Sequence, residues 1–156
     1  MSSISKPMRI TSWVLQIIAA FILGQTLFFK LTGTEETRAL FEVLGAEPAG
    51  RYATAVLELV AVVLLLIPRT AAVGGVVALG VISGAIMAHL TKLGVSIDAE
   101  ALGNPGLAEM EGPSLFVMAV VVFVSSLGVI VIRRGELPVI GSRLGGGGAR
   151  GDSSPA

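Results

Sequence analysis

Four long apolar stretches dominate this chain of 156 residues. They run over about residues 11–31, 52–67, 70–93 and 113–132, each close to the length that a helix needs to cross the hydrocarbon core of a bilayer. Charged residues make up 14% of the chain, whereas a soluble domain carries about 25%. A water-soluble core cannot absorb this excess of apolar side chains. We therefore predict an all-α fold, an integral membrane four-helix bundle.

The remaining segments are short. Residues 34–44 predict a short amphipathic helix between spans 1 and 2, with Thr34 as N-cap and Gly45 as stop, which either lies on the membrane surface or caps the bundle. We expect the first span to be retained, because its apolar run exceeds that of a signal peptide and no small-x-small cleavage site follows. The bundle then occupies residues 1–140, and the Gly-rich segment 141–156 is expected to be a disordered cytoplasmic tail.

The basic residues predict an orientation, because Lys and Arg in short loops favour the cytoplasmic side. The connections and tails on the side of the N-terminus hold the larger set, which is Lys6, Arg9, Arg69, Arg133, Arg134 and Arg143. The opposite side holds Lys30, Arg38, Arg51 and Lys92. We therefore expect both termini to be cytoplasmic and the lipid bilayer to be the chain's constant partner.

Composition excludes several classes of function. The net charge is zero, which gives no electrostatic indication of a nucleic-acid partner. No cysteine is present, so thiolate catalysis and iron–sulfur ligation by this chain are excluded, and the single histidine disfavours a metal site. The sequence contains no recognisable catalytic motif, so it identifies no catalytic residues, and no cofactor is evident.

Small residues in the third stretch indicate close helix packing. The spacings Gly80–Gly84 and Gly84–Ala88 put small side chains on one helical face, where lipid supplies no hydrophobic drive and close backbone approach stabilises contacts. We expect this face to pack inside the bundle.

Three ionisable residues fall within the spans at the same side of the membrane. Glu58 lies about 9 Å and His89 about 6 Å inside their span ends, and Lys30 is one residue from the end of its span. Arg51 is two turns before Glu58 on one helical face, and Gln25 lies at a depth similar to that of Glu58. Such residues usually face protein and have partners. We predict one polar cluster that opens to the external side.

Each member of the cluster has two interpretations. Lys30 and Arg51 either take part in a site or extend to the nearby interface. Glu58 is either a structural ion-pair partner or a group that handles a ligand or a proton. His89 is either an interhelical hydrogen-bonding group or a proton carrier.

Several short motifs follow one another over about residues 10–132. They are Gly24-Gln25-Thr26-Leu27-Phe28-Phe29-Lys30-Leu31-Thr32-Gly33, Phe41 with Leu44-Gly45, Gly50-Arg51-Tyr52, Glu58-Leu59-Val60-Ala61 with Ile67-Pro68, and Gly84-Ala85 with His89-Leu90. Their order and spacing resemble those of the DoxX and DoxX-like membrane proteins. The resemblance implies a four-helix bundle in a bacterial cytoplasmic membrane. The family is named for a subunit of a quinone-linked thiosulfate oxidoreductase, and relatives are associated with redox and oxidative-stress assemblies.

Three functions follow as hypotheses. The first is an accessory subunit without catalytic activity that holds a quinone or a lipid in the polar pocket and supports redox partner proteins. The second is a quinone-reducing subunit in which Glu58 and His89 relay protons. The third is a small permease formed by a homodimer. The sequence lacks the inverted repeat that is common among transporters, which disfavours this hypothesis.

Overall fold

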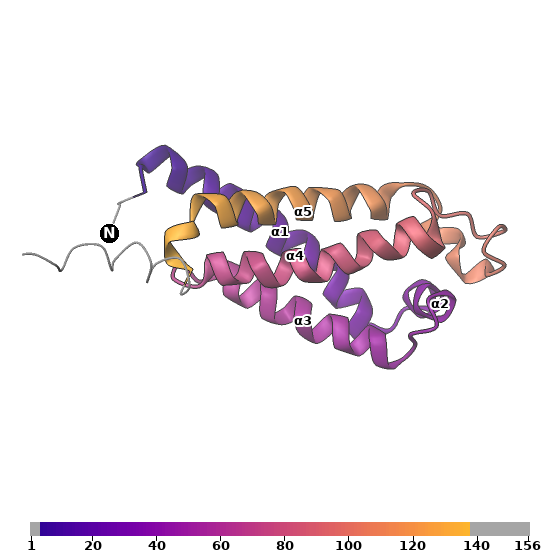
Figure 1. Ribbon diagram of the computed structural model, residues 1–156. Coiled ribbons are helices and arrows are strands. Elements are labelled where there is room, and N and C mark those ends of the chain that lie inside the picture. Colours follow the sequence, from indigo (N-terminus) through magenta and orange to yellow (C-terminus); the bar gives the residue numbers. More distant parts are fainter. Residues whose placement is uncertain (1–3, 138–156) are drawn as a thin grey trace, which may run out of the picture.

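The computed structural model describes residues 4–137 and shows a bundle of long helices (Figure 1). The long helices are α1 (Lys6–Thr32), α3 (Ala49–Leu66), α4 (Ala71–Ala88) and α5 (Ser114–Ile132), and α4 continues through the π-helical turn η1 (His89–Leu93). All four are long and apolar enough to cross a membrane. The predicted all-α membrane bundle is confirmed, and no strand occurs within residues 4–137. The predicted tail, 141–156, lies outside the described residues.

Successive long helices run in opposite directions, and each packs against two neighbours in the cyclic order α1, α3, α4, α5. Large apolar side chains cover the outer surface: Phe21 is 72%, Ile10 64% and Phe28 61% exposed. Soluble proteins rarely expose apolar surface on this scale, and helices that keep their backbone hydrogen bonds internal are suited to lipid. The chain is a multi-pass membrane protein.

The interior is built from small residues. Ala19, Ala61, Ala71 and Ala78 are fully buried around Leu65. The closest helix contact occurs at Gly74, where an added Cβ would lie 2.5 Å from the backbone nitrogen of Leu65. Only glycine fits there, because backbone atoms cannot move aside as a flexible side chain can.

The predicted packing face of Gly80, Gly84 and Ala88 is wrong for this bundle. Gly80 and Gly84 are exposed, and a Cβ added to either would meet nothing within 4 Å. The reason is rotational, because α4 buries Ala78 and Ile82, and Gly80 lies on the opposite side of the helix from both. Gly74 and Gly75 make the close contacts instead.

Gly74→Ala should therefore destabilise the bundle, whereas Gly84→Ala should not. The methyl group at position 74 would press on backbone atoms of α3, and overpacking of this kind lowers the free energy of unfolding by about 1–3 kcal/mol. The methyl group at position 84 meets nothing, and alanine is the better helix former. Unfolding of both variants in mixed micelles measures the difference. Equal stability of the two would contradict the packing described.

A buried arginine holds one end of the bundle together. This end carries Lys6, Pro68 and Arg133 and is called the terminal end below. Arg133 is 4% exposed, and its Nε donates to Ser12 Oγ at 2.7 Å. Its Nη1 donates to the carbonyl oxygen of Pro68 at 2.7 Å and pairs with Glu136 at 3.0 Å. Arg133 thus connects α1, the α3–α4 turn and the residues after α5.

The opposite end is called the capped end, because two segments outside the long helices cover it (Figure 1). They are α2 (Glu35–Val43) and the loop 94–112, which contains the 3-10 helix η2 (Pro105–Met110). Ala39 of α2 packs with Ile97, Ala99 and Leu107 in a separate small core. The sequence left two roles open for this amphipathic helix, on the membrane surface or as a cap of the bundle. In the structure it packs as a cap.

Candidate functional site

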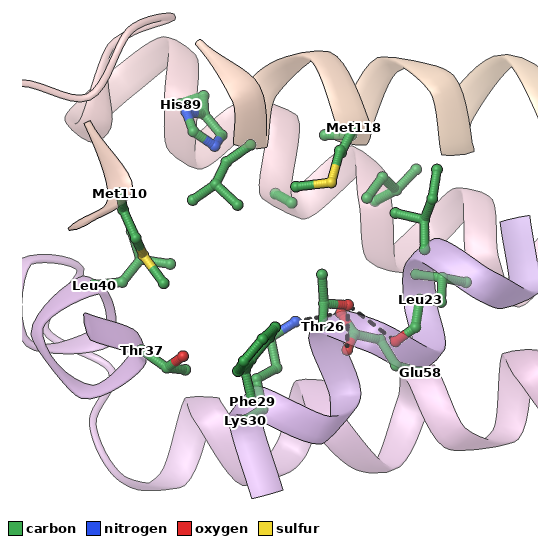
Figure 2. A pocket seen from close by; sticks show the side chains of 15 residues that line it. Leu23, Thr26, Phe29, Lys30, Thr37, Leu40, Glu58, His89, Met110 and Met118 are labelled. Carbon is green, nitrogen blue, oxygen red and sulfur yellow. Dashed lines mark hydrogen bonds and ion pairs between the residues drawn. The ribbon is translucent and has the colours of Figure 1, made fainter. Parts of the chain in front are cut away.

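A cavity of about 130 Å³ lies among the four long helices beneath the cap (Figure 2). Its wall is mainly apolar, with Lys30, Glu58 and His89 as the ionisable groups. The other lining residues are Ile22, Leu23, Thr26, Phe29, Thr37, Leu40, Ile82, Ala85, Met110, Leu115, Met118 and Ala119. All four long helices and both capping segments contribute, so the cavity exists only in the assembled bundle.

Lys30 and Glu58 form an ion pair on one wall of the cavity. Lys30 Nζ donates to Glu58 Oε1, and the side chains are 15% and 4% exposed. Helical side chains lean toward the N-terminus of their helix. Lys30, near the end of α1, therefore leans into the bundle, and Glu58, near the middle of α3, leans toward the capped end. The two groups meet because the helices are antiparallel.

Thr26 adds a hydroxyl to this pair. Its Oγ1 lies 3.3 Å from Glu58 Oε2 and 3.0 Å from the carbonyl oxygen of Leu23, so its single proton serves one acceptor at a time. The sequence reasoning missed Thr26, although its position four residues before Lys30 puts both on one face of α1.

Gln25 does not belong to the cluster, contrary to the prediction. Its side chain is exposed on the outer surface of α1 and does not line the cavity. Gln25 has the right depth but the wrong direction, because adjacent helical residues point about 100° apart and Thr26 already faces inward.

Arg51 is buried, as expected of a cluster member, but it does not reach Glu58. Its Nε donates to both carboxylate oxygens of Glu47 at 2.9 Å, its Nη1 donates to the carbonyl oxygen of Lys30, and its guanidinium stacks over Tyr52. The leaning of helical side chains explains this: α3 begins at the capped end, so Arg51 points toward Glu47 and away from Glu58. Arg51 holds the last turn of α1, which carries Lys30.

His89 faces the cavity from the wall opposite Lys30 and Glu58 (Figure 2). The residue is 5% exposed, and its Nδ1 lies 2.8 Å from the carbonyl oxygen of Gly94. Its ring meets that of Phe116 edge to face, with centroids 5.6 Å apart. The observed hydrogen bond is local to the end of α4, so His89 does not make the interhelical hydrogen bond that one interpretation predicted.

The cap supplies lining residues that the sequence did not indicate. Met110 of η2 and Leu40 of α2 close the cavity at the capped end, and Met118 of α5 lies on the wall that carries His89 (Figure 2). Nothing in a local pattern marks these residues: Leu40 and Met110 meet the cavity only through the long connections between spans, and Met118 lies in a span that is apolar all round.

The site combines an apolar wall with charges that neutralise each other. A space of this kind suits a small neutral molecule with an apolar body and a few hydrogen-bonding groups. No group of three or more His, Asp or Glu side chains suited to hold a metal ion occurs within residues 4–137. Neither the family models nor the curated proteins nor the solved structures yield a match to this chain.

A double-mutant cycle tests the ion pair. Lys30→Met and Glu58→Met each leave one charge buried without its partner, which should lower the free energy of unfolding by about 3 kcal/mol each. The double variant removes both charges and should be more stable than either single variant. Thermal unfolding in micelles measures all three, with Lys6→Met, at an exposed lysine that makes no ion pair within residues 4–137, as control. Purely additive losses would show that the two groups do not interact.

Proposed function

We propose that this chain is a DoxX-like membrane protein that holds a small lipid-soluble molecule, a quinone or a lipid, in the cavity and supports a redox assembly without catalysing a reaction itself. The observation that carries the proposal is that the buried Lys30–Glu58 pair borders an open cavity. An ion pair with a purely structural role would be enclosed by packed side chains. Here it lies beside space that a ligand can fill, with His89 on the opposite wall.

The setting follows from the same proposal. We place the chain in a bacterial cytoplasmic membrane with both termini in the cytoplasm, as the basic residues and the family resemblance favour. The capped end then faces the external side. A redox partner would dock to the outer surface of the bundle or to the cap, and the ligand would connect the two proteins.

The ligand should be found by releasing the protein gently from its membrane and identifying the molecules that accompany it by mass spectrometry. Glu58→Gln removes the carboxylate that holds the Lys30 ammonium in place at the cavity wall. If the ligand loses its charge-assisted hydrogen bond to Lys30 as a result, about 1.5–3 kcal/mol, the amount of bound molecule should fall about tenfold. Gln25→Leu changes an intramembrane polar residue outside the cavity and should have no effect. Undiminished ligand in a fully accumulated Glu58→Gln protein would reject the proposal.

A second candidate is a quinone-reducing subunit, and it is favoured by one observation: Glu58 and His89 line the same cavity. Two groups able to exchange protons would then flank one ligand. Electrons would have to come from another chain. Quinone reduction with thiosulfate, measured for the purified protein and for the protein with its co-purified partners, separates the candidates. Activity that falls in both Glu58→Gln and His89→Gln variants supports the enzyme, and inactivity of both preparations rejects it.

A small permease has less support. A path through the interior of one bundle would have to pass the terminal end, where buried Arg133, Ser12 and Gln16 are hydrogen-bonded to one another in a chain, so a permease needs a path between two copies of the chain.

A further inference from the structure

The size of the cavity limits what part of a ligand can enter. At about 130 Å³ it is close to the engineered apolar cavity of about 150 Å³ that binds benzene. One six-membered ring therefore fits inside it, and the rest of a larger molecule would extend out of the cavity. This step rests on the proposed function, namely that the cavity holds a small molecule.

The charges of the wall limit the head group further. Lys30 and Glu58 are already paired, so the cavity has no uncompensated charge to offer. A phosphate or carboxylate would have to separate Lys30 from Glu58 and leave the buried carboxylate without a partner, which is costly in an apolar interior. The head group is therefore neutral.

The apolar wall favours an aromatic ring. Met110 at the capped end and Met118 on the wall that carries His89 bring polarizable sulfur atoms to the cavity, and Phe29 lies on the wall that carries Lys30 (Figure 2). Sulfur–aromatic contacts favour an aromatic ring over a saturated one of the same size.

His89 determines which polar group the ring must carry. The carbonyl oxygen of Gly94 can only accept a hydrogen bond, so Nδ1 carries the proton, and in the neutral imidazole Nε2 is left as an acceptor. Within the part of the chain that the structure describes, no protein group hydrogen-bonds Nε2. The residue is 5% exposed and its ring is held against Phe116. Because His89 lines the cavity, Nε2 is an accessible acceptor there, and a donor on a ligand can bond to it.

We propose that the cavity selects a neutral aromatic ring with a hydroxyl group, a phenol or a hydroquinone, whose O–H donates to His89 Nε2. Across the ring, Lys30 has N–H groups beyond the one bonded to Glu58, and these serve an oxygen on the far edge. Among the molecules of the proposed function, the site therefore favours a reduced quinol over the oxidised quinone, which has only acceptors, and over a phospholipid.

The single histidine makes the hydrogen bond directly observable. Protein labelled with ¹⁵N-histidine, purified through a tag without histidine and kept in nanodiscs at about pH 8, where free imidazole is neutral, should show a protonated Nδ1 and an unprotonated Nε2. Titration with 4-propylphenol should shift the Nε2 resonance saturably. Titration with 4-propylanisole, in which a methyl group replaces the donor hydrogen, should leave it in place.

Two variants complete the test. Isothermal titration calorimetry does not depend on the histidine signal. In His89→Phe it should find 4-propylphenol binding weakened about fivefold, as the loss of one hydrogen bond predicts, and level with that of 4-propylanisole. Ala85→Phe fills the wall beside His89 and should abolish the saturable response, which shows that the probe acts from the cavity and not from the lipid.

Three results would overturn the inference: a wild-type protein that binds both probes equally, an Nε2 resonance that neither probe moves, or an Nδ1 that is unprotonated. None of these results decides whether a molecule co-purifies with the protein, or whether the amount of that molecule falls in the Glu58→Gln variant. The proposed function is therefore judged separately, by the co-purification experiment.

Discussion

The ion pair between Lys30 and Glu58 is the interaction on which the architecture of the capped end depends. Neither charge is tolerated alone among apolar side chains, so α1 and α3 must lie in the one register that joins them. Arg51 also holds this register at the capped end, because its guanidinium donates to the carbonyl oxygen of Lys30 in the last turn of α1. The cavity lies directly beside the pair, since both residues line it.

The two ends of the bundle have different physical roles. At the terminal end, Gly74 brings α4 against the backbone of α3, and Arg133 connects three parts of the chain through short hydrogen bonds. At the capped end, the space between the helices is closed by side chains from α2 and η2, which rest on a small core of their own. Close packing at one end provides stability, and the separate cap at the other leaves room for a ligand.

The chemistry of the cavity follows from which groups are already satisfied. Glu58 has Lys30 and Thr26, and Nδ1 of His89 has the carbonyl oxygen of Gly94. The remaining capacity is an acceptor on one wall and ammonium donors on the other. A neutral ring with oxygens on opposite edges uses both, which connects the proposed quinone-type ligand to particular atoms of the protein.

The sequence by itself determined the four spans and that Lys30, Glu58 and His89 lie in the same half of the membrane, because depth depends only on the constant rise of a helix and on bilayer thickness. Only the tertiary structure decided which side chains of each helix point into the bundle and which point outward. It turned Thr26 inward and Gln25 outward, and it made Gly74 the close contact in place of Gly84. The physical reason is that the rotation of each helix about its axis is set by packing against its neighbours, and four nearly uniformly apolar spans carry too little amphipathic pattern to specify that rotation.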